Sequence, residues 1–146
     1  TFCGAIEIAG WTHLGVDLIK DGMNKHNINH TMIIPSPIEP RFSRYLVFEG
    51  YSVDEEGTQH YLDASVAYRR ACMEAVNYLT QFGYTGEQAY TILGTAPVEG
   101  RISSIVDLPN ACCTLWIPTE IFDFDIMPSD EGPKQVVKGG ELPKAL

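Results

Sequence analysis

The sequence predicts an α+β fold: a mostly antiparallel β-sheet or sandwich with a two-helix segment packed on it. Apolar residues alternate with a period of two near both ends of the chain, whereas between them they recur with helical spacing. The order strands, helix pair, strands is typical of helices packed on one antiparallel sheet. The predicted segments are β-rich 1–60, helical 63–96, β 99–122 and an extended tail 128–146.

Four strands are predicted in the β-rich segment. They are FCGAIEIA at 2–9, THLGVDLIK at 12–20, TMII at 31–34 and RYLVFEGYSV at 44–53. Each is rich in β-branched or aromatic residues, or alternates apolar with polar ones. The stretches between them, DGMNKHNINH and PSPIEP, have the composition of turns and loops.

The helical segment predicts two helices. In the first, Val66, Ala67, Ala71, Ala75, Val76 and Leu79 recur at the intervals of one helix face. Gly83 is a suitable helix stop. Thr85 with Gln88 forms a capping box that starts the second helix, and Pro97 ends it.

Strand patterns return after the helices. RISSIVDL at 101–108 and ACCTLWIP at 111–118 are predicted strands, separated by Pro109-Asn110. The following PTEIF predicts a short helical turn.

Charge and cysteine content exclude several classes of protein. The net charge is −9 and the pI about 4.7, so a nucleic acid is not expected as a partner. No apolar run is long enough to span a bilayer, so no membrane partner is expected. The four cysteines form no C-x-x-C motif, which favours reduced thiols in a cytoplasmic protein.

Charged residues share one side of the predicted strand that begins the last β segment. Alternation places Glu99, Arg101, Ser103 and Asp107 on one face, opposite a mostly apolar face. We expect Arg101 to bond a carboxylate. Two interpretations stay open: a solvated face with a surface salt bridge, or the polar wall of a small cavity.

The first predicted strand also carries a carboxylate. Its face consists of Thr1, Cys3, Ala5, Glu7 and Ala9. The small neighbours of Glu7 suit either a pocket for a small substrate or the close approach of another strand. The four histidines, His13, His26, His30 and His60, are too scattered for a metal motif and are expected at the surface.

Three stretches carry a family resemblance: TFCGAIEIAGW, YLDASVAYRRACMEAVNYLTQFGYTGEQAY and LGTAPVEGRISSIVDLPNACCTLWIPTEIFDFDI. They resemble the C-terminal part of formamidases of the acetamidase/formamidase family. The resemblance implies that residues 1–146 are the C-terminal part of a longer homo-oligomeric enzyme that hydrolyses formamide, or another small amide, to formate and ammonia. It also implies a divalent metal, with zinc expected, whose ligands lie largely before residue 1.

The resemblance also implies site residues. Glu7 matches the glutamate of the family's G-x-A-I-E strand, and Glu99 and Asp107 match acidic positions in and after the P-V-E-G-R-I-S motif. We expect these three to be catalytic, with Glu7 as a proton relay, because amide hydrolysis must activate water and protonate the leaving amine. Arg101, Ser103 and Cys3 are expected to support the substrate.

Three further expectations concern alternatives to this chemistry. The isolated chain is expected to be inactive, because its implied metal ligands lie elsewhere. A non-catalytic subunit that completes a β-core or an oligomer interface is one alternative. A nucleophilic thiol such as Cys112, or an N-terminal Thr1, is the other.

Overall fold

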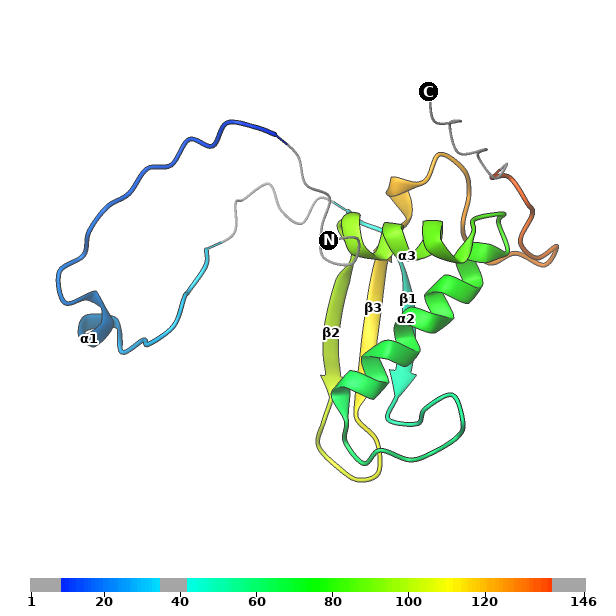
Figure 1. The fold of residues 1–146 in the computed structure, drawn as a ribbon, viewed down its shortest axis with the longest axis horizontal. Helices are drawn as coiled ribbons and strands as arrows, with labels where there is room; N and C mark the ends of the chain where they lie inside the picture. The colour runs from blue at the N-terminus through cyan, green and yellow to red at the C-terminus, as the bar shows by residue number, and fades with distance from the viewer. Residues whose placement is uncertain (1–8, 35–41, 138–146) are drawn as a thin grey trace. The chain divides into compact units, whose positions relative to one another are not determined.

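The computed structural model describes residues 9–34 and 42–137 (Figure 1). These residues fall into two compact units, one in each range. The predicted strand at 2–9 lies almost wholly outside the described residues. Predictions about Thr1, Cys3 and Glu7 therefore stay predictions.

The unit at 9–34 contains one short helix, α1 (Gly22–His26), in the region that was predicted to be a turn. The strands predicted at 12–20 and 31–34 are wrong, because neither range has regular secondary structure. The alternating Leu14, Val16 and Leu18 are 80%, 88% and 84% exposed. Alternation alone does not hold a strand, which needs a hydrogen-bonded neighbour and a face to bury.

The unit at 42–137 contains an antiparallel sheet that confirms the predicted fold class. Strands β1 (Tyr45–Tyr51), β2 (Glu99–Ser104) and β3 (Cys112–Pro118) have the order β1-β3-β2. Central β3 is mostly buried, as its apolar sequence suggests. Within 42–137 there is this one three-stranded sheet, so the sandwich variant of the prediction is not seen there.

Two helices pack beside the sheet, and Figure 1 shows α2 (Ala64–Thr80) crossing one of its faces. Asp63 caps α2 because its side chain accepts hydrogen bonds from the backbone N–H groups of Ser65 and Val66. The alanine stripe of α2 is fully buried, partly against Leu115 and Ile117 of β3. The predicted capping box of Thr85 and Gln88 is confirmed at the start of α3 (Gly86–Thr95).

The chain after β3 contacts α2 again. The predicted helical turn is confirmed as the 3-10 helix η1 (Thr119–Ile121). Farther on, the Tyr78 hydroxyl of α2 donates a 2.6 Å hydrogen bond to the carbonyl of the buried Ile126. None of the helices within 9–34 and 42–137 has the length and apolar character needed to cross a membrane.

Candidate functional site

The polar residues predicted from alternation lie on the sheet face opposite α2, called here the open face. The strand register settles this, because Arg101 and Glu49 both pair with Thr114, from the two sides of β3. Their neighbours in sequence point the other way, as Cys113 and Leu115 pack against the α2 side. Glu49, Thr114 and Arg101 therefore form a row across three strands, about 10 Å long.

Arg101 is held by two contacts on the open face. Its Nη2 donates a 2.7 Å hydrogen bond to Glu99 Oε2, which confirms the predicted pairing with a carboxylate. Its guanidinium carbon lies 4.0 Å from the centroid of the Trp116 ring, a cation–π contact. The side chains of Arg101 and Glu99 are 49% and 44% exposed, so the ion pair adds little stability. What the two contacts fix is the orientation of the guanidinium plane.

Thr114 links this arrangement to Ser103. Thr114 is 5% exposed, and its hydroxyl accepts a 2.9 Å hydrogen bond from the indole N–H of Trp116. The same hydroxyl lies 2.8 Å from Ser103 Oγ. Ser103 thus lies on the predicted face. We call Glu99, Arg101, Ser103, Thr114 and Trp116 the Arg101 cluster.

Asp107 is not part of this face, and the prediction that it shares the strand with Arg101 is wrong. Strand β2 ends at Ser104, which pairs with Cys112 at the start of β3. The residues between them form the connecting loop, and Asp107 lies exposed within it. Pro109 has no N–H to donate, so the loop cannot continue the ladder there. The catalytic role expected of Asp107 therefore loses its geometric support.

Glu49 and Tyr51 are open-face residues that the sequence reasoning missed. The Tyr51 hydroxyl lies 3.4 Å from Glu49 Oε2, and the charge of Glu49 raises the pKa of Tyr51. The missed signal was the alternation in β1, which places Tyr45, Val47, Glu49 and Tyr51 on one face. The open face thus carries two carboxylates, Glu49 and Glu99, on either side of β3.

The described cysteines are poor nucleophiles. Burial raises the pKa of the Cys72, Cys112 and Cys113 thiols, and the charge of Glu49 raises that of Cys112 further. Cys113 is 1% exposed and its thiol donates to the carbonyl of Ala64. All three therefore stay protonated at neutral pH, which counts against a thiol-nucleophile mechanism. Cys3 lies outside the described residues.

No group of three or more metal-binding side chains occurs within the described part of the chain. His13, His26 and His30 are exposed, as predicted. His60 Nε2 lies 2.6 Å from Asp54 Oδ2, and this contact lowers the pKa of Asp54. Asp54 also accepts hydrogen bonds from the backbone N–H groups of Glu56 and Thr58. Asp54 and His60 therefore close a turn.

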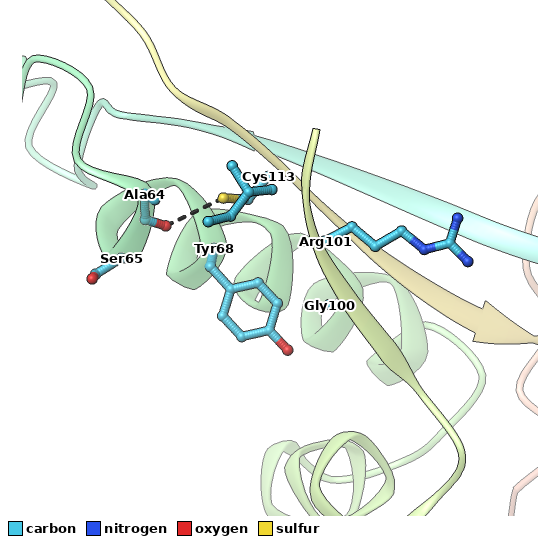
Figure 2. Close-up of a pocket in the computed structure, with 7 residues that line it drawn as sticks. Ala64, Ser65, Tyr68, Gly100, Arg101 and Cys113 are labelled. Atoms are coloured by element: carbon cyan, nitrogen blue, oxygen red, sulfur yellow. Dashed lines mark hydrogen bonds between the residues drawn. The ribbon is translucent and has the colours of Figure 1, made fainter. Parts of the chain in front are cut away.

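A pocket of about 440 Å³ lies on the other side of β2, next to α2. Its lining residues are Ala64, Ser65, Tyr68, Gly100, Arg101, Ile102 and Cys113. Figure 2 shows the Arg101 side chain extending away from Tyr68 and Cys113. Arg101 therefore borders the pocket, but its side chain extends to the opposite face of β2.

Sequence comparison finds a formamidase and an acetamidase among the relatives of this chain. The chain is 62% identical over 140 residues to a formamidase of Methylophilus methylotrophus, covering 96% of this chain and 34% of that protein. It is 50% identical over 101 residues to an acetamidase of Mycolicibacterium smegmatis, covering 68% of this chain and 25% of that protein. The chain thus spans about a third or less of these relatives.

A solved structure and a family model agree with these relatives. The gamma lactamase from Delftia acidovorans superposes with a TM-score of 0.90 at 62% sequence identity, covering 95% of this chain and 34% of that one. The model of the acetamidase/formamidase family matches residues 1–124. The match takes in β1 to β3, the helices α1 to α3 and the Arg101 cluster. The chain therefore belongs to the acetamidase/formamidase family.

Proposed function

We propose that this chain is part of an amide hydrolase that converts formamide and water to formate and ammonia. The 62% identity to a formamidase across 96% of the chain carries this proposal. The gamma lactamase and the acetamidase among its relatives are named for other amide substrates, so amide hydrolysis is the broader proposal and formamide the narrower one. Because the chain spans 34% of the formamidase, the activity is proposed for a longer protein.

The Arg101 guanidinium suits the oxygen of such a substrate. In the reaction, water adds to the amide carbon, the C–N bond breaks, and the leaving nitrogen takes up a proton to depart as ammonia. A guanidinium has five N–H donors, and among the described residues Glu99 accepts a hydrogen bond from one of them. The remaining donors match the fork geometry of a carboxylate such as formate, and they also suit the oxyanion that precedes it.

The acidic residues have different proposed roles in the reaction. We propose that Glu7 relays the proton from water to the leaving amine and that Glu99 holds Arg101 in place. Ser103 holds Thr114, and through it the Trp116 ring on which Arg101 rests. Cys3 remains a predicted support residue. For Asp107 we propose no chemical step, because it lies in the loop after β2.

The divalent metal, with zinc expected, remains a prediction from the family. The described residues offer no group of three or more metal-binding side chains. We propose that its ligands come largely from the rest of the enzyme. Homo-oligomerisation and a cytoplasmic location likewise remain predictions, and the native mass of the complete enzyme tests the first of them.

The isolated 146-residue chain is expected not to hydrolyse formamide, even with added zinc. The physical reason is that the described residues include the guanidinium that we propose for the substrate oxygen, but no group of three or more metal-binding side chains. Ammonia release by the purified chain, with the complete enzyme as the positive control, measures this. Turnover by the isolated chain would show that the catalytic set lies wholly within these residues and would contradict the proposed division.

Arg101→Lys in the complete enzyme is expected to lower kcat/KM about 10- to 100-fold. A lysine keeps the charge but loses the planar fork and its stacking on Trp116, a loss comparable to one charged hydrogen bond. Arg69→Lys is the matched control, because Arg69 bonds Glu55 on the exposed side of α2. Equal kcat/KM for the two variants would remove Arg101 from the proposed site.

A further inference from the structure

The unit at 9–34 exposes large apolar side chains in two runs. The first run is Leu14, Val16 and Leu18, which are each at least 80% exposed, and the second is 32–34, with each residue at least 65% exposed. No residue described between 9 and 34 is buried, so the unit has no core that these side chains could join. Exposed apolar side chains gathered in a short segment mark an interaction surface.

The backbone of the first run lacks partners as well. Residues 12–18 have no regular secondary structure, and α1 begins after them, at Gly22 (Figure 1). No backbone hydrogen bond joins any residue of 12–18 to another described residue. Unpaired backbone groups beside exposed apolar side chains are what a neighbouring strand can satisfy.

The side chains of this segment differ in chemistry from one residue to the next. Leu14 and Val16 alternate with His13, Gly15 and Asp17. In an extended segment these two sets lie on opposite sides. A fitting partner therefore offers a free strand edge to the backbone and an apolar surface to one side of the segment. The polar side needs no cover from the partner.

The lengths of the relatives indicate which partner this is. The formamidase match covers 96% of this chain and the gamma lactamase match 95%, which leaves too few residues unmatched to omit 12–18. This chain spans 34% of each of those proteins, so in both of them the segment belongs to a polypeptide that lies mostly outside the matched region. A larger body of protein is therefore available there to cover the segment.

We propose that residues 12–18 pair with a sheet edge in the part of the complete enzyme that this chain does not span. The apolar side of the segment is buried against that part, and His13 and Asp17 face away from it. Addition of an extended segment to a free sheet edge is a recurrent way of docking, because the backbone hydrogen bonds supply affinity. The inference rests on the proposed longer enzyme and not on its amide chemistry.

One substitution in two settings tests the apolar contact. In the complete enzyme, Val16→Asp is expected to lower the melting temperature by about 5 °C or more, because it buries a charge. In the 146-residue chain, where Val16 is 88% exposed, the same substitution is expected to leave the unfolding midpoint unchanged. Asp17→Asn, on the polar side, is the control and is expected to have little effect in either setting.

Two melting results would overturn the proposal. One is an equal melting temperature for the original complete enzyme and its Val16→Asp variant. The other is a loss in the Asp17→Asn variant as large as that in Val16→Asp, which would contradict the assignment of the two sides.

Amide hydrogen exchange tests the backbone contact in the unaltered proteins, so it does not depend on a variant that folds. In the 146-residue chain we expect the amides of 12–18 to exchange as fast as those of an unfolded peptide. In the complete enzyme we expect at least every second amide of 12–18 to exchange about 100-fold more slowly, because a paired strand directs alternate N–H groups to its neighbour.

Two exchange results would overturn the proposal. Fast exchange of 12–18 in the complete enzyme would show that nothing pairs with the segment. Protection in the 146-residue chain that rises with protein concentration would assign the segment to a second copy of this chain. Neither measurement uses catalysis. An enzyme that hydrolyses formamide with 12–18 unprotected defeats this proposal alone, and one that protects 12–18 without hydrolysing formamide defeats the other alone.

Discussion

Glu7→Gln in the complete enzyme is expected to lower the turnover number about 100-fold or more, as the loss of a general base does. Glutamine keeps the shape of the side chain but cannot accept the proton that hydrolysis must move from water to nitrogen. Glu7 also matches the glutamate of the family's G-x-A-I-E strand, and no cation lies near it in sequence. Steady-state kinetics of ammonia release measure the effect.

Cys112→Ser in the complete enzyme is the matched control for that experiment. Burial raises the pKa of the Cys112 thiol, so we expect near-normal turnover and a stability loss of about 1–2 kcal/mol. The opposite pattern would contradict the carboxylate mechanism. If Glu7→Gln keeps its turnover while a folded Cys112→Ser protein is inactive, a thiol nucleophile takes the place of the proton relay.

Gly50→Ala is expected to destabilise the unit at 42–137 by about 3 kcal/mol or more. A Cβ atom at Gly50 would collide with the carbonyl oxygen of Ala67 and lie 2.5 Å from the backbone nitrogen of Ala71. Both atoms belong to the backbone of α2, so no side-chain rotation relieves the clash. The helix would have to move off β1, separating its buried alanine stripe from the sheet. Urea unfolding followed by circular dichroism measures the change.

Gly94→Ala is the control for this experiment, because its expected effect on stability has the opposite sign. Gly94 lies in α3, and apart from its chain neighbours and the backbone of its own helix, no atom of the described residues lies within 4 Å of its Cβ position. Alanine there is expected to raise stability by about 0.5 to 1 kcal/mol through the lower entropy of the unfolded chain. Equal unfolding midpoints for Gly50→Ala and the original chain would show that α2 does not pack on β1 this closely.

Helices α2 and α3 and the buried strands could be predicted from sequence because their signals are local. The capping box at Thr85 and the alanine stripe of α2 both need residues three or four positions apart. The strands predicted at 12–20 and 31–34 failed for the opposite reason. Their alternation resembled that of β1, but a strand depends on a neighbour that local sequence does not specify.

The Arg101 cluster was predictable only in part, for the same reason. Glu99 and Arg101 are two positions apart on one strand, so alternation alone placed them together. Trp116 and Thr114 reach the cluster from β3 through the strand register, which a pattern within β2 cannot supply. Asp107 was misplaced because the alternation continues past Ser104 although the ladder stops there.

The contact between Trp116 and Arg101 gives the protein an optical reporter. The chain has two tryptophans, Trp11 and Trp116, and Trp11 is 96% exposed. Trp116 is partly covered by Arg101 and by the ring of Tyr45, whose centroid lies 5.6 Å from the centroid of the Trp116 ring. In a Trp11→Phe protein, the remaining fluorescence comes from a single indole on the open face. The emission wavelength of Trp116 and its quenching by acrylamide then report the binding of any strand or small amide beside Arg101, and no added label is needed.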